Sequence, residues 1–94
     1  MNRVYKYKLL TADGRPDTFK AEMPEGSILF VEIENEPPLP LGRITLWSRV
    51  DLMDDPDYVR TFRVFGTGHD IPANYAHVHT WRDSQFIWHL FEEG

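Results

Sequence analysis

The sequence contains no cysteine, which excludes disulfide cross-links, thiolate metal sites and cysteine nucleophiles. Long apolar runs are missing as well. No stretch approaches the roughly 20 residues of a membrane-spanning helix, and the amino-terminal segment lacks the apolar core of a signal peptide. These absences predict a cytoplasmic protein that does not enter a membrane.

Basic side chains are scarce in the second half of the chain. Residues 1–50 carry seven acidic and seven basic side chains, whereas residues 51–94 carry eight acidic side chains against Arg60, Arg63 and Arg82. Because non-specific nucleic-acid binding depends on many Lys and Arg contacts, the net charge of −5 argues against an extended nucleic-acid surface. A small, localised anion site remains open.

A helical stripe of apolar residues is also absent, and alternation with a period of two takes its place. The 94 residues, 41% hydrophobic and 27% charged, are enough for one globular domain covering residues 1–94. We predict a mainly β domain, either an antiparallel β-sandwich or a small barrel of about seven short strands. At most one helical turn is expected, near residues 53–59. The expected strands are residues 4–10, 17–23, 27–34, 44–50, 58–65, 75–81 and 85–92.

Two of these strands are the richest in aromatic and β-branched residues. Residues 58–65 and 85–92 should bury most of the apolar surface, so we expect them in the middle of the fold. The Asp13-Gly14 pair tolerates positive φ and predicts a turn that joins residues 4–10 and 17–23 as a hairpin.

Two polar segments each allow a second interpretation. Residues 35–42 contain Pro37, Pro38 and Pro40, which cannot donate to a strand ladder, so they predict a connection. Pro37 and Pro40 also match the spacing of a proline-rich ligand. Residues 51–57 carry four carboxylates, which indicate a solvated turn, or a calcium loop without its usual glycine and glutamate.

The turn Gly66-Thr67-Gly68-His69 is the first candidate site. Glycines let the backbone approach a ligand, and successive amides can surround an anion beside a hydroxyl and an imidazole. Arg63 would bind a phosphate or carboxylate with two N–H groups. The alternative is a turn kept for its geometry. We predict ligand binding by Arg63, Gly66, Thr67, Gly68 and His69, with Trp47 or Trp81 stacking on the ligand.

The histidines are the second candidate. His77 and His79 are two apart on an expected strand, so both rings should project from one face, as paired imidazoles do at zinc or copper. His69, His89 and Asp70 would complete such a set. The alternative is a solvated strand face without metal, and we predict no cofactor.

Catalytic motifs are not evident. Ser27, Ser48 and Ser84 each lack the sequence context of an activated nucleophile, and the sequence cannot place two carboxylates at a catalytic separation. We therefore expect a binding protein and not an enzyme.

Two stretches form a specific pair of motifs, Arg60-Thr-Phe-Arg-Val-Phe-Gly-Thr-Gly-His-Asp-Ile-Pro72 and Phe86-Ile-Trp-His-Leu-Phe-Glu92. They resemble a family of small uncharacterised proteins from bacteriophages and actinobacteria. The chain departs from that family by carrying His77 and His79. The resemblance supplies a setting without an established activity.

In that setting we expect a small non-enzymatic binding protein of phage type, active in the host cytosol as a homo-oligomer. Its ligand would be a small anionic, nucleotide-like signal of host defence. The alternative is an interaction or structural module that binds a host or virion protein.

Overall fold

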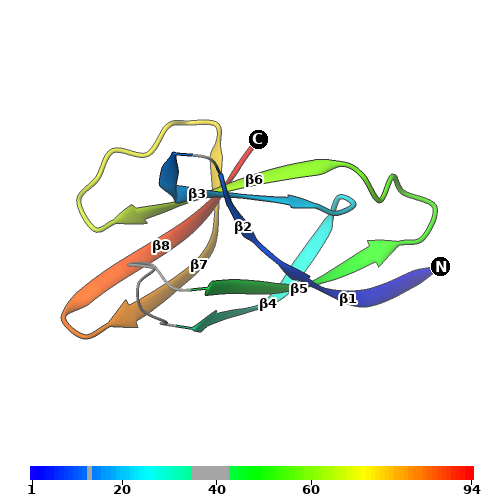
Figure 1. Cartoon of the computed structure of the whole chain (residues 1–94), viewed down its shortest axis with the longest axis horizontal. Coiled ribbons are helices and arrows are strands. Elements are labelled where there is room, and N and C mark those ends of the chain that lie inside the picture. Colours follow the sequence, from blue (N-terminus) through cyan, green and yellow to red (C-terminus); the bar gives the residue numbers. More distant parts are fainter. Residues whose placement is uncertain (13, 35–42) are drawn as a thin grey trace.

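A computed structural model of the chain describes residues 1–12, 14–34 and 43–94. These residues contain no helix, and none of them forms an apolar helix that could cross a membrane. They form eight strands (Figure 1): β1 (Asn2–Lys8), β2 (Leu10–Ala12), β3 (Arg15–Glu22), β4 (Gly26–Glu34), β5 (Arg43–Asp51), β6 (Val59–Gly66), β7 (Tyr75–Asp83) and β8 (Phe86–Glu93).

The strands make two antiparallel sheets. One has the order β1-β5-β4 and the other the order β2-β3-β6-β8-β7 (Figure 1). Within the described ranges the two sheets do not close into a barrel, so the prediction of a mainly β, antiparallel fold is confirmed in its sandwich form. The described residues hold eight strands where the sequence indicated about seven, because the first expected strand divides into β1 and β2.

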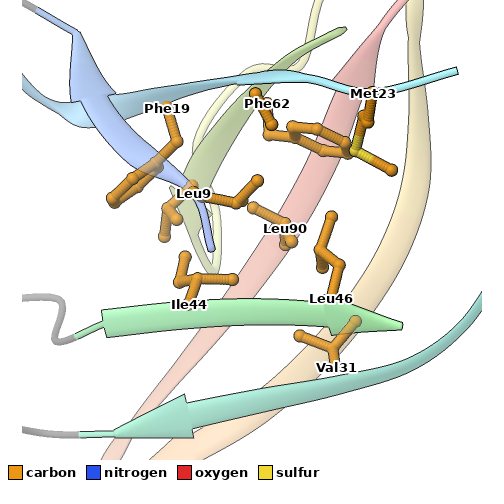
Figure 2. Packing of buried hydrophobic residues seen from close by; sticks show 10 residues of the cluster. Leu9, Phe19, Met23, Val31, Ile44, Leu46, Phe62 and Leu90 are labelled. Atoms are coloured by element: carbon orange, nitrogen blue, oxygen red, sulfur yellow. The ribbon is translucent and has the colours of Figure 1, made fainter. Parts of the chain in front are cut away.

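The core lies between the two sheets and is built by the alternating apolar positions of their strands. Figure 2 shows side chains from both sheets meeting there. Burial of such side chains contributes about 25 cal/mol per Å² of apolar surface and is the main stabilising term. The buried cluster consists of Leu9, Phe19, Ala21, Met23, Val31, Ile44, Leu46, Phe62, Val64 and Leu90.

The two aromatic strands lie in the middle of the larger sheet. β6 and β8 are neighbours there, flanked by β3 and β7, which confirms their predicted position. The predicted hairpin of residues 4–10 with 17–23 is wrong in most of its length. β1 pairs with β5, and only the short β2 pairs with β3. The chain changes sheets at Leu9, which is buried and whose N–H donates to the Ile44 carbonyl at 2.9 Å.

The carboxylate-rich segment forms a turn. Asp51 Oδ1 accepts from the Met53 N–H at 3.0 Å, and Asp55 Oδ1 accepts from the Asp57 N–H at 2.9 Å. The segment is therefore a turn, as predicted, and the helical turn near residues 53–59 is not formed. Asp13 and residues 35–42, with the Pro37 and Pro40 spacing, lie outside the described residues.

Gly26 allows β4 to begin close against β5. It pairs with Val50, and a Cβ at this position would overlap the backbone carbonyl of Arg49. We expect Gly26→Ala to lower the free energy of unfolding by about 1–3 kcal/mol, because backbone and not a flexible side chain must move. Urea denaturation measures this loss. Ser27→Ala at the exposed neighbouring position is the control, and an equal effect of the two changes would contradict the prediction.

Candidate functional site

The outer face of the five-stranded sheet, which is the face turned away from the core, carries most of the candidate residues. Phe62, Val64 and Leu90 point into the core, so the residues between them point outward. The strand register then places side chains in rows across the sheet. Arg63 lies opposite Phe91, which lies opposite His77. Phe65 lies opposite His89, which lies opposite Thr80.

Aromatic rings form a cluster in the middle of this outer face. Phe65 makes edge-to-face contacts with Tyr75 at 5.5 Å and with Phe91 at 5.6 Å, measured between ring centroids. The Arg63 guanidinium lies 4.9 Å from the centroid of Phe65, within range of a cation–π interaction. The cluster thus fixes the direction in which Arg63 extends.

An open groove of about 1310 Å³ runs beside this cluster, over β2, β3 and β6. Arg63 lines the groove and forms an ion pair with Asp17, with 3.2 Å between Nε and Oδ2. The side chains of Arg63 and Asp17 are 41% and 40% exposed. Residues with a hydroxyl group, among them Thr18, Thr61 and Tyr75, also line the groove. Its charged lining consists of Lys8, Arg15, Lys20 and Arg63 with Asp17, Glu22 and Glu93.

Next to the aromatic cluster, four polar side chains form one hydrogen-bonded chain. His77 Nε2 lies 2.7 Å from Thr80 Oγ1, which lies 2.9 Å from His89 Nδ1. His89 Nε2 lies 3.1 Å from Thr67 Oγ1, and that hydroxyl donates to the Ile87 carbonyl at 3.3 Å. This His–Thr chain (His77, Thr80, His89 and Thr67) connects β7, β8 and the turn after β6.

The predicted ligand turn is largely bonded to the protein itself. The Gly66 N–H donates to His69 Nδ1 at 3.2 Å, and the His69 N–H donates to the Gly66 carbonyl at 3.2 Å. Gly68 has a φ of 90°, a conformation that favours glycine. Thr67 and His69 remain exposed, but the two amides and the Thr67 hydroxyl are already occupied. Ligand binding at this turn stays a prediction that this geometry does not favour.

The two predicted stacking tryptophans lie elsewhere. Trp47 is on β5 in the other sheet, with its ring 5.4 Å from that of Phe30. Trp81 packs against the core cluster and so points to the inner side of its sheet. The structure therefore brings Arg63 and Thr67 onto one face but does not bring Trp47 or Trp81 to them.

His77 and His79 do not share a face, so that expectation is wrong. The register of β7 against β8 shifts between them, which leaves His77 opposite Phe91 but puts His79 opposite the buried Leu90. His79 stacks on Trp81 at 6.1 Å. Partial burial, and secondly the charge of His77, hold the pKa of His79 below its usual value. Within the described residues, no three His, Asp or Glu side chains gather as a metal site.

Sequence reasoning missed Thr80, Lys20, Thr61 and Tyr75. The period-two pattern does contain a signal for Tyr75 and Thr61. Tyr75 lies two residues from His77 on one strand, and Thr61 lies two residues from Arg63 on another, so each pair shares a face of its strand. What the sequence could not supply is the order of the strands, which places these two pairs on either side of β8.

The comparisons with known proteins identify a family without assigning an activity. A family described as a domain of unknown function, DUF7352, matches residues 1–94. No curated protein and no solved structure matches the chain. Because the match covers the whole sequence, the chain belongs to the DUF7352 family.

Proposed function

We propose that the chain is a non-enzymatic binding protein that holds a small anionic, nucleotide-like ligand in the groove over β2, β3 and β6. One observation carries this proposal. Four basic side chains and three carboxylates line the groove, although the whole chain has a net charge of −5. A locally positive concave surface on an acidic protein concentrates anions at that place.

Arg63 is the centre of the proposed site. Its guanidinium is oriented by the Phe65 ring and is paired with the carboxylate of Asp17, both at the surface. An exposed ion pair of this kind contributes only about 0–1 kcal/mol, so a phosphate can replace Asp17 at little cost. A phosphate also accepts two parallel N–H bonds from a guanidinium.

The biological setting is part of the same proposal. The motif from Arg60 to Pro72 and the motif from Phe86 to Glu92 resemble those of small proteins from bacteriophages and actinobacteria. This resemblance supports an origin in one of these two groups. The ligand would then be a nucleotide-derived signal of host defence, withdrawn by binding in the host cytosol. Withdrawing a signal requires that the protein bind it and not that it convert it. Basic and hydroxyl-bearing residues line the groove, and such residues can bind an anion.

Removing the charge of Arg63 and Lys20 tests the site. We expect Arg63→Gln with Lys20→Gln to weaken binding of the best ligand at least tenfold, because each charge-assisted hydrogen bond contributes about 1.5–3 kcal/mol. Isothermal titration with mononucleotides, cyclic dinucleotides and ADP-ribose measures the effect. Arg49→Gln, which changes an exposed arginine on the other sheet, is the control. The site is rejected if no member of the panel binds, or if the double variant binds as the wild type does.

A second function is favoured by exposed apolar side chains on the smaller sheet. Val4, Leu29 and Phe30 are 54%, 55% and 58% exposed, and Phe30 contacts Trp47. Such a surface suits contact between protein chains. The chain would then be a homo-oligomer, or a module that attaches to a host or virion protein. Native mass spectrometry that detects a stoichiometric partner, with no response to the ligand panel, would favour this alternative.

A further inference from the structure

The His–Thr chain has a direction, because one end of it can only accept a hydrogen bond. The Ile87 carbonyl accepts from the Thr67 hydroxyl, which has a single proton. We assign that proton to the Ile87 carbonyl, so Thr67 Oγ1 accepts in its contact with His89 Nε2 at 3.1 Å. On this assignment His89 carries its proton on Nε2, whereas a Thr67 hydroxyl that donated to His89 would leave Nε2 bare.

The hydrogen bonds keep the same direction as far as His77. A neutral His89 with a proton on Nε2 has a bare Nδ1, so the Thr80 hydroxyl donates to it at 2.9 Å. Thr80 Oγ1 then accepts from His77 Nε2–H at 2.7 Å. His77 is left with a bare Nδ1, which has no hydrogen-bond partner among the described residues. The chain thus presents one acceptor of fixed direction at the surface.

His77 is not among the residues that line the proposed ligand groove, but it lies on the same strand as one of them. His77 is two residues along β7 from Tyr75, which lines the groove. Its ring makes an edge-to-face contact with the Phe91 ring, with 5.3 Å between the ring centroids. It also shares a row with Arg63, separated by β8. Two strand spacings place the two residues about 10 Å apart. An acceptor, aromatic rings and a guanidinium therefore follow one another across the outer face.

We infer, building on the proposed function, that His77 Nδ1 reads an amino group on the base of a nucleotide whose phosphate binds near Arg63. The ligand class is an aminopurine or aminopyrimidine nucleotide. The base lies against the partly exposed rings of Tyr75 and Phe91, which cover the buried Phe65, and its exocyclic amine donates to His77. Thr80 acts as a positioning residue, since its hydroxyl fixes which nitrogen of His77 is bare.

The first arm of the test needs no ligand. Long-range ¹H–¹⁵N spectra of the wild-type protein should show His77 and His89 protonated at Nε2 with bare Nδ1. Thr80→Val should leave His77 as a mixture of tautomers, and Thr80→Ser should restore the wild-type pattern because it keeps the hydroxyl. A proton on Nδ1 of neutral His77 in the wild-type protein would overturn the inference.

The second arm uses nucleotides that differ only in the amine. Adenosine monophosphate is compared with purine riboside monophosphate, and cytidine monophosphate with its analogue lacking the 4-amino group. We expect the better-binding pair to favour the amine about three- to tenfold in the wild type, as one hydrogen bond predicts. Thr80→Val should reduce this preference, because only part of the His77 population then has a bare Nδ1, and Thr80→Ser should keep it.

The outcomes separate this inference from the function on which it rests. If the four nucleotides bind and depend on Arg63, but the amine makes no difference, only the role of His77 is overturned. If the preference survives Thr80→Val unchanged, the role of the His–Thr chain is overturned. If none of the four nucleotides binds, the inference that the ligand is an aminopurine or aminopyrimidine nucleotide is overturned, whatever tautomers the spectra show.

Discussion

Replacing Arg60 by methionine is expected to lower the free energy of unfolding by about 3 kcal/mol, which is a large part of the stability of so small a domain. Arg60 is only 7% exposed and forms a two-pronged ion pair with Glu92, Nε to Oε2 and Nη2 to Oε1, both at 2.6 Å. Its Nη1 also donates to the carbonyls of Pro24 and Gly26 at 3.2 and 3.1 Å. The methionine fills the volume but leaves these acceptors without a donor.

The loss is large because the remaining partners cannot all turn to water. The Glu92 side chain is 23% exposed, so its carboxylate would lose its countercharge in a partly buried place. Urea denaturation of Arg60→Met measures the change, with Arg3→Met at an exposed position as the control. A loss below about 1 kcal/mol, the size of an ordinary surface pair, would contradict this account.

Arg60 has a structural role that its charge alone did not indicate. It alternates with Phe62 and Val64, so a period-two pattern places its guanidinium on the core side of the strand. That placement indicates a buried charge in need of a partner. The sequence could not name Glu92, because 32 residues separate the two and only the pairing of β6 with β8 brings them together.

The strands were predictable from local pattern, whereas their partners were not. Aromatic and β-branched content predicted that β6 and β8 lie in the middle of the larger sheet, and they do. The expectation that both bury most of the apolar surface is wrong for β8, where Leu90 alone is buried, whereas β5 buries Ile44, Leu46 and Val50. The turn at Gly14 suggested a hairpin, but the burial of Leu9 takes β1 to β5 instead. The alternation of apolar and polar residues along a strand tells which side chains share a face, but it does not tell which strands are its neighbours.

The candidate site followed the same division. Arg63, Thr67 and His69 were chosen for their chemistry, and the structure places Arg63 in a groove and Thr67 in the His–Thr chain. The single-residue shift between His77 and His79 has no clear signal in a strand of ordinary composition. It nevertheless decides the site, since it turns one imidazole outward and the other toward Trp81.

The two faces of β8 connect stability to the proposed site. Leu90 and Glu92 point to the inner side, where one packs in the core and the other binds Arg60. His89 and Phe91 point to the outer side, where they hold the His–Thr chain and the aromatic cluster. A strand anchored so firmly on one face presents the side chains of its other face in fixed positions, which a ligand site requires.

Leu90→Ala is expected to lower the free energy of unfolding by about 2–5 kcal/mol, because the side chain is 0% exposed and its removal leaves a cavity between the two sheets (Figure 2). Leu90 lies opposite Val64 on one side and His79 on the other, so the middle of the larger sheet loses its packing. Leu29→Ala is the matched control, since Leu29 is 55% exposed and should change stability by less than about 0.5 kcal/mol. Urea denaturation compares the two, and equal losses would contradict the position of β8 at the centre of the core. A folded Leu90→Ala protein should still show the wild-type tautomers of His77 and His89, because the cavity opens on the face opposite to theirs.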